Sequence, residues 1–218
     1  MQLIGMLDSP YVRRVAISLQ LLGLPFEHRS ISVFRQFDTF REINPVVKAP
    51  TLVCDDGTVL MDSTLILDYA EALAAPRATL MPRAVADRLR CLRLLGLALA
   101  ACEKAVQIVY ERHQRPPERQ HEPWVERVRG QLHAAVDGLE DELQRRPLLL
   151  EDGAIDQAGV TCAVTWKFIE QMVAGEIAAS RIPALSTLST RAEALPAFAA
   201  APYGPATVDP AISRRSAA

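Results

Sequence analysis

The sequence predicts a small α/β domain followed by an all-helical domain, and three observations support this fold class. Short apolar runs of strand type alternate with amphipathic stretches over residues 1–76. Prolines and a change of hydrophobic period around residues 75–83 indicate a linker, which we place at 77–83. Beyond it, over residues 84–218, apolar side chains recur at helical spacing, so we expect helices alone there.

The first domain opens with an apolar run at residues 1–7 that suits a buried strand. Pro10 stands where the first turn of a helix tolerates proline, and Gly23 is placed to end that helix. Residues 25–33 alternate well enough for a second strand, and residues 37–45 are expected to be helical.

Residues 51–62 predict a hairpin that turns at Asp55-Asp56-Gly57. The helix that follows is expected to have Ser63 as its N-cap. The order of elements in this domain is therefore β-α-β-α-β-β-α.

In the helical domain, the spacing predicts a long helix that ends at about His113 and two amphipathic helices at 124–146 and 182–195. The helix predicted between them, 155–174, is apolar on nearly all sides, which is typical of the buried centre of a bundle. The tail after residue 202 has no periodicity, so we expect it to fray or lie on the surface.

Composition excludes several classes of function. The formal net charge is −2, so no global basic field favours nucleic acid or an anionic membrane as partner. The four cysteines are scattered without metal-ligand spacing, which favours buried thiols in a reducing compartment and no metal. The longest apolar run, 94–102, is far shorter than the roughly 20 residues of a membrane span. We therefore expect a cytoplasmic protein.

Three short elements form a candidate site. Ser9 places a hydroxyl at the start of the Pro10 helix, and Ala49-Pro50 opens a strand where a cis peptide bond is expected. Asp62-Ser63 begins the next helix, whose N-terminus suits a carboxylate while Asp62 suits an ammonium group. Together they could hold a ligand with an amino-acid head and a peptide-like body.

These stretches resemble a known family. "SPYVRRV" (9–15), "NPVVKAPTLVCDDGTVLMDSTLILDYAE" (44–71) and "DGAIDQAG" (152–159) are similar to the three signature regions of the cytosolic glutathione S-transferase superfamily, in particular its bacterial members with an N-terminal serine. The resemblance implies a thioredoxin-like first domain that binds glutathione as co-substrate, a helical domain that contributes the second-substrate pocket, and a homodimer.

Carried over residue by residue, Ser9 corresponds to the hydroxyl that hydrogen-bonds the glutathione sulfur and is the candidate catalytic residue. The remaining candidates would bind glutathione or the second substrate. Ala49 and cis-Pro50 correspond to the pair that contacts the cysteinyl unit, Asp62 and Ser63 to the pair that holds the γ-glutamyl head, and Lys48 to a further glutathione contact. Tyr11 and Phe34, on loops close to the thiol, and Tyr110 and His113, near the end of the long helix, are candidates for the second-substrate pocket; the first two are also candidates to contact glutathione.

The chemistry expected is activation of a thiol for detoxifying conjugation with a small apolar electrophile. A free thiol has a pKa of about 8.5, and lowering it by about two units requires about 2.7 kcal/mol. A hydrogen bond from Ser9 and the helix N-terminus could together supply this. Disulfide exchange is disfavoured because a serine stands where that chemistry needs a sulfur nucleophile.

Two alternatives stay open: a non-catalytic binding or regulatory protein of the same fold, and a specialised glutathione-dependent isomerase or dehalogenase. Two further expectations concern structure. Asp156 corresponds to the acidic residue of an N-capping motif within the third bundle helix, with Gly153 at the usual Ser/Thr position. Arg13 and Arg14 are expected to be solvated or ion-paired at the surface, and the alternative is that one of them approaches the ligand or the dimer partner.

Overall fold

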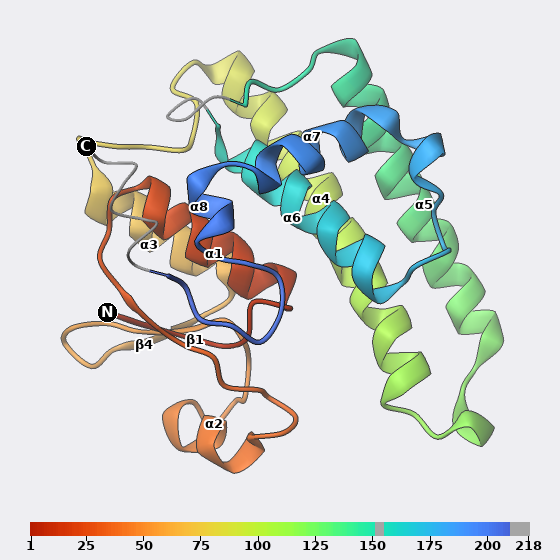
Figure 1. The fold of residues 1–218 in the computed structure, drawn as a ribbon, viewed down its shortest axis with the longest axis horizontal. Coiled ribbons are helices and arrows are strands. Elements are labelled where there is room, and N and C mark those ends of the chain that lie inside the picture. Colours follow the sequence, from red (N-terminus) through yellow and green to blue (C-terminus); the bar gives the residue numbers. More distant parts are fainter. Residues whose placement is uncertain (151–154, 210–218) are drawn as a thin grey trace. The chain divides into compact units, whose positions relative to one another are not determined.

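The computed structural model describes residues 1–150 and 155–209, which fall into two compact units (Figure 1). The second unit is Met81–Ala192, and the first combines Met1–Leu80 with the chain from Glu193 onward. We expected the helical domain to include everything after residue 84. The segment after Glu193 instead makes its contacts with the first unit, as described below.

The first unit is built on a four-stranded mixed sheet in the order β2-β1-β3-β4. Strands β1 and β2 are parallel, and β3 is antiparallel to both β1 and β4. The strands are β1 (Gln2–Ile4), β2 (Glu27–Arg29), β3 (Thr51–Val53) and β4 (Val59–Met61). The predicted hairpin is confirmed, and Gly57 adopts a φ of 86° in its turn, a conformation that glycine accepts readily.

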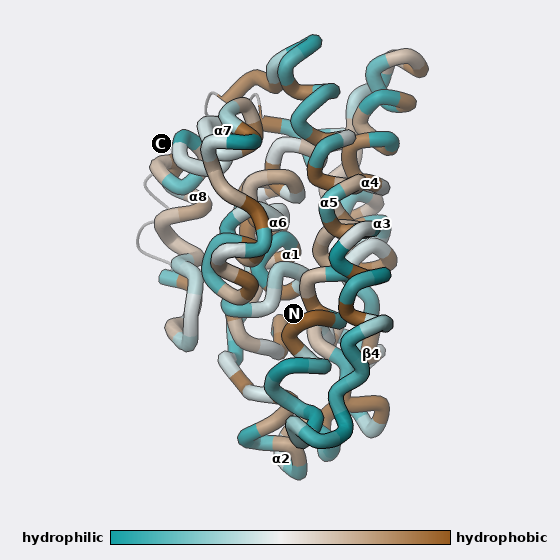
Figure 2. The backbone as a smooth tube through the Cα atoms, turned by 90° about the vertical axis from the view of Figure 1, so that its right-hand side faces the viewer, coloured by the Kyte–Doolittle hydropathy of each residue, from teal (hydrophilic) through white to brown (hydrophobic). Residues whose placement is uncertain are grey.

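Helices cover both faces of this sheet. Helices α1 (Pro10–Leu21) and α3 (Ser63–Ala74) lie on one face, and α2 (Phe37–Ile43) lies on the other (Figure 1). The strand β1 alternates accordingly: Leu3 is fully buried, and its neighbour Ile4 packs with Phe40 of α2. Figure 2 shows this apolar β1 segment beside the N-terminus. The α/β arrangement is the fold class predicted for this part of the chain.

The two arginines of α1 are buried, so the expectation that they lie at the surface was wrong. Arg13 is 1% exposed and Arg14 is 3% exposed. Arg13 forms two hydrogen bonds of 2.6 and 2.7 Å to the carboxylate of Glu193, and its Nε donates to the carbonyl of Ala201 at 2.8 Å. Its guanidinium also lies over the Phe198 ring. A buried cation of this kind requires such partners, because its desolvation is otherwise costly.

The C-terminal segment, which includes α8 (Pro196–Ala199), makes a second contact with the sheet through His28. The backbone N–H of Val208 donates to Nδ1 of His28 at 3.1 Å, and Nε2 lies 2.8 Å from the carbonyl oxygen of Gly5. Since Nδ1 accepts a hydrogen bond, the proton of the neutral ring is on Nε2, which donates to Gly5. We expected this tail to lie on the surface, and over its described residues it is attached at defined points.

The second unit is a bundle in which α4 packs against both α5 and α6. Its helices are α4 (Val85–His113), α5 (Glu122–Arg145), α6 (Gln157–Met172) and α7 (Pro183–Glu193), the last of which ends at the unit boundary. The predicted apolar stripe of α5 is buried, and along this helix hydrophobic and hydrophilic stretches alternate (Figure 2). As predicted, α6 is buried on nearly all sides.

The start of α6 differs from the expectation. Asp156 does not lie within the helix but is its N-cap, and its carboxylate accepts a hydrogen bond from the N–H of Gly159 at 2.8 Å. Gly153, the expected capping position, lies outside the described residues. Among the helices of the described chain, none is long and apolar enough to cross a membrane.

We predict that lowering the pH destabilises the protein through His28. Burial lowers the pKa of its ring, so the unfolded chain binds the proton more readily than the folded one. The contribution of neutral His28 is complete above the unfolded pKa of about 6.5 and is lost as the pH falls towards the folded value. Denaturant unfolding at several pH values between about 7.5 and 5.5 measures the resulting decrease in the free energy of unfolding. In His28→Gln the free energy of unfolding should decrease less over this pH range than in the wild type. An equal decrease in both proteins would contradict the prediction.

Candidate functional site

Ser9 is the N-cap of α1, and the helix begins at Pro10 as predicted. Its backbone is extended, with φ −73° and ψ 122°, and its Oγ accepts a hydrogen bond from the N–H of Val12 at 3.4 Å. The residue is half-buried. Because Oγ is used here as an acceptor, the hydroxyl proton remains available for a bond to another group.

Gly5 shows how tightly three segments meet beside this corner. A Cβ added to Gly5 would lie 2.6 Å from a methyl carbon of Val12 and 3.2 Å from the Cβ of Ala49. The first distance is too short for any side chain, and the φ of Gly5, 135°, is itself rarely adopted by other residues. The absence of a side chain at Gly5 therefore lets the end of β1, helix α1 and the Ala49 loop approach one another.

The peptide bond between Ala49 and Pro50 is cis, as predicted. Ala49 is half-buried, Pro50 is buried and Lys48 is exposed. Within the described residues, neither the backbone N–H nor the C=O of Ala49 has a hydrogen-bond partner. These groups are therefore free to pair with an extended peptide-like ligand.

The start of α3 differs in one respect from the prediction. Its N-cap is Asp62, whose carboxylate accepts from the N–H of Thr64 at 2.9 Å, and Ser63 is the first helical residue. Asp62 has a φ of 71°, a strained value for a residue with a side chain. Its carboxylate lies 4.0 Å from Nζ of Lys48, which joins this helix start to the Ala49 loop.

Ser63 is buried, and its hydroxyl serves a different partner. Nη1 of Arg14 donates to the Ser63 Oγ at 3.0 Å and to the Thr64 Oγ1 at 3.4 Å. The Arg14 side chain thus extends from α1 to the residues that begin α3. The structure brings Ser9, Ala49 and Ser63 onto adjoining segments of one unit, linked through Gly5 and Arg14.

Two polar residues near Ser9 were missed by the sequence analysis. Burial raises the pKa of Asp8, against the opposing effects of the Ser9 backbone and of Arg35. Burial also raises the pKa of Tyr203 to about 12, and the nearby Asp8 adds to this shift. Asp8 could have been noticed because it precedes Ser9, whereas Tyr203 lies in a tail without any periodic signal.

The aromatic candidates near the thiol lie on different elements. Tyr11 is half-buried in the first turn of α1, two residues after Ser9. Phe34 lies between β2 and α2, and 52% of it is exposed. Tyr11 is therefore close to Ser9 in sequence, whereas Phe34 lies on a different segment of the same unit.

The two candidates for the second substrate lie on the last turn of α4. Tyr110 is 46% exposed. His113 lines a cavity of about 290 Å³ between the ends of α4 and α6. Other residues of its lining are Ile108, Val109, Arg112, Met172 and Val173. Tyr110 is not part of this lining, although it lies three residues before His113 on the same helix.

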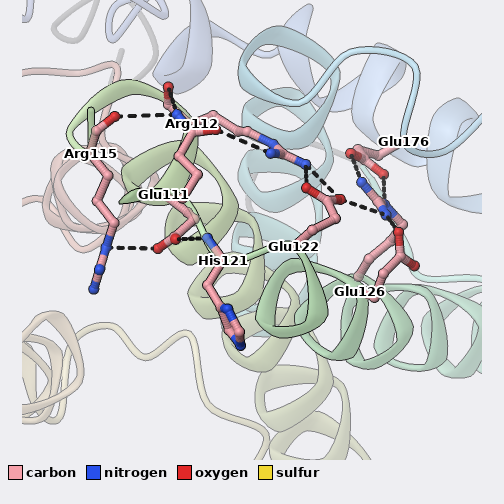
Figure 3. Close-up of polar contacts among 9 residues, drawn as sticks. Glu111, Arg112, Arg115, His121, Glu122, Glu126 and Glu176 are labelled. Carbon is pink, nitrogen blue, oxygen red and sulfur yellow. Dashed lines mark hydrogen bonds and ion pairs between the residues drawn. The ribbon is translucent and has the colours of Figure 1, made fainter. Parts of the chain in front are cut away.

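Charged side chains fix the structure next to this cavity (Figure 3). Nη2 of Arg112 lies 2.8 and 2.9 Å from the two carboxylate oxygens of Glu122, and Nε of Arg129 donates to Glu176 at 2.6 Å. The buried Glu111 accepts from the backbone N–H of His121 at 2.8 Å. These contacts join the end of α4, the start of α5 and the loop after α6, which gives the cavity a fixed wall.

Comparison with known proteins agrees with this architecture. Residues 3–78 match the family described as "Glutathione S-transferase, N-terminal domain". A glutathione S-transferase from Methylobacterium radiotolerans, solved with glutathione sulfonate, superposes with a TM-score of 0.83 at 28% identity, over 95% of this chain and 97% of that one. The chain has the fold of the glutathione S-transferase superfamily.

Two further similarities extend the comparison to most of the chain. A glutathione transferase family member from Pseudomonas fluorescens Pf-5, solved with S-(propanoic acid)-glutathione, gives a TM-score of 0.75 at 27% identity, covering 92% of this chain and 98% of that one. The uncharacterized GST-like protein YibF of Escherichia coli K12 is 27% identical over 175 residues, which are 80% of this chain and 86% of YibF. These matches extend the similarity to glutathione S-transferases beyond the first unit to most of the chain.

We predict that Asp62 stabilises this transferase fold through its cap. Replacing it by alanine removes the bond to the Thr64 N–H and places a non-polar side chain at φ 71°, which should cost about 1–2 kcal/mol of unfolding free energy. Asp62→Asn is the matched control, because asparagine caps about as well as aspartate and is one of the residues most often found at positive φ. Chemical denaturation of the three proteins measures the difference, and equal losses in both variants would contradict the capping role.

Proposed function

We propose that this chain is a glutathione transferase of the serine type, which binds glutathione in its first unit and transfers the sulfur to a small apolar electrophile. The observation that carries the proposal is the convergence of the Ser9 hydroxyl, the free backbone of Ala49 and the start of α3. A hydrogen-bond donor, a peptide-pairing backbone and an anion-binding helix N-terminus are the three features that a γ-glutamyl tripeptide thiol requires.

The γ-glutamyl head is proposed to bind at the start of α3. The helix N-terminus and the Ser63 hydroxyl suit its carboxylate, and the Asp62 carboxylate suits its ammonium group. Lys48, about half exposed beside Asp62, is proposed to contact another part of the tripeptide. The cysteinyl unit would pair with the backbone of Ala49 next to Pro50.

The sulfur is proposed to lie at the start of α1. There the Ser9 hydroxyl donates to the thiolate, and the partial positive charge of the helix N-terminus favours the anion further. Ser9 does not need to lose its proton, because its role is to donate it. Catalysis then consists of stabilising the thiolate and positioning it for attack on the electrophile.

The cavity of the helical unit is the proposed source of contacts to the second substrate. Its volume of about 290 Å³ lies near the lower end of the range for small-molecule sites, which favours a compact electrophile. Ile108, Val109 and Met172 would contact the substrate body, and His113 is proposed to contact its polar groups together with the other polar lining residues, Arg112, Gln171 and Glu176. Tyr110 stays a second candidate on the same helix.

Two observations support the proposal at a coarser level. The M. radiotolerans and P. fluorescens relatives were solved with glutathione derivatives, so a tripeptide site on this fold has precedent among similar chains. The four cysteines of this chain are free and buried, which fits the proposed cytoplasmic location.

Calorimetric titration with glutathione tests the proposal first, since a transferase should bind it saturably at millimolar concentration or below. The pKa of the bound thiol, followed by thiolate absorbance, then tests Ser9. In Ser9→Ala we expect this pKa to rise by about one unit, because one charge-assisted hydrogen bond is lost. Ser30→Ala is the control: it removes a hydroxyl that donates to the Pro205 carbonyl, and it should leave the pKa of the bound thiol unchanged. Absence of saturable binding would favour the binding-protein alternative.

The second copy of a homodimer is proposed to pack against an apolar stripe at the start of α4. Val85, Leu89 and Leu92 recur at helical spacing there and are 84%, 70% and 51% exposed. Apolar side chains exposed in this pattern are typical of an interaction surface, and the resemblance to the superfamily favours a second copy as the partner.

We predict that Leu89→Glu combined with Leu92→Glu halves the mass measured by light scattering after size-exclusion chromatography, because burying two carboxylates at the interface is costly. Leu149→Glu alters another exposed leucine, 71% accessible, and should leave the mass unchanged. A dimeric double variant would rule out this surface as the interface.

A further inference from the structure

We propose that Arg14 is a positioning residue for ligand binding, because it fixes the hydroxyl of Ser63 as a hydrogen-bond donor towards the carboxylate of the γ-glutamyl group. This inference rests on the proposed function and goes beyond it by assigning a role to a residue that does not itself contact the ligand. The evidence is the pair of hydrogen bonds from Arg14 to Ser63 and Thr64.

The direction of these hydrogen bonds follows from chemistry. A guanidinium group has five N–H donors and no acceptor, whereas a hydroxyl can donate once and accept twice. The contact of 3.0 Å between Nη1 of Arg14 and Oγ of Ser63 therefore requires the oxygen to accept. The hydroxyl proton must point away from Arg14, where it can serve an anion.

The local structure of α3 leaves Ser63 free for this task. A serine at a helix start commonly caps the helix by accepting from a backbone N–H. Here Asp62 accepts the Thr64 N–H, so Ser63 is not needed as a cap. Ser63 is 4% exposed, and this burial strengthens the bond that orients its hydroxyl.

The charge of Arg14 acts in the same direction. Its guanidinium is 3% exposed and lies at the positive end of the α3 dipole. A cation in this position adds to the attraction that the helix N-terminus exerts on a carboxylate, with little screening by water. The orientation of the Ser63 hydroxyl and the charge of Arg14 together predict that Arg14 raises the affinity for ligands that carry the γ-glutamyl α-carboxylate.

The test compares two ligands by calorimetry: glutathione, and γ-aminobutyryl-cysteinyl-glycine, which keeps the thiol and the ammonium but lacks the α-carboxylate. In Arg14→Met we expect the dissociation constant of glutathione to rise about tenfold, the effect of one charge-assisted hydrogen bond. The dissociation constant of the analogue should change by less than about twofold, because the affected group is absent from it. In a Ser63→Ala background, Arg14→Met should raise the dissociation constant of glutathione by a smaller factor than in the wild-type background, because only the charge effect of Arg14 remains to be lost.

Arg13→Met is the matched control, because Arg13 is the adjacent buried arginine of α1 but is bound to Glu193 and Ala201. It should lower stability while leaving the ratio of the two dissociation constants at the wild-type value. If Arg14→Met does not fold, Arg14→Gln, which is too short to reach Ser63 and uncharged, takes its place.

The outcomes separate this inference from the proposed function. If wild-type protein binds glutathione but Arg14→Met weakens both ligands equally, Arg14 has only a structural role and the inference is overturned. The same follows if the glutathione affinity of Arg14→Met is unchanged. If wild-type protein does not bind glutathione at all, the proposed function fails together with the inference.

Discussion

Two adjacent buried guanidinium groups on α1 are the constraint around which the first unit is arranged. Each must exchange its water shell for protein partners, since an unpaired buried cation would cost several kcal/mol. Arg13 is satisfied by the Glu193 carboxylate and the Ala201 carbonyl, groups that lie 180 or more residues further along the chain. Arg14 points instead to the two hydroxyls that begin α3. The C-terminal segment and α3 are thereby both attached to the helix that begins at Ser9.

The two serines of the candidate site share one chemical arrangement. Ser9 accepts from the Val12 N–H and Ser63 accepts from the Arg14 guanidinium, so in each case the protein occupies an acceptor site and leaves the hydroxyl proton available. Both hydroxyls can therefore donate to an anion, and the thiolate and the carboxylate of the proposed ligand are anions. Asp8, beside Ser9, carries a pKa raised by burial.

Local patterns made much of this structure predictable from sequence. The Asp-Asp-Gly turn, the proline at the start of α1 and the apolar stripe of α5 each depend on neighbours within a few residues. The burial of Arg13 and Arg14 was not predictable, because their partners are distant in sequence and a paired buried arginine leaves no local pattern. The same holds for the N-cap of α3, where Asp62 and Ser63 are equally suitable by type and the contact with Arg14 distinguishes them.

The C-terminal segment reaches the candidate site by a second route that is independent of Arg13. Val208 donates to His28, and the same ring donates to the Gly5 carbonyl. Gly5 in turn is the position at which Val12 and Ala49 approach too closely for any side chain. Only a neutral imidazole can accept on one nitrogen and donate on the other, so the connection depends on the protonation state of His28. The last described residues of the chain therefore help to hold the corner at which Ser9 begins α1, although no sequence motif marks them.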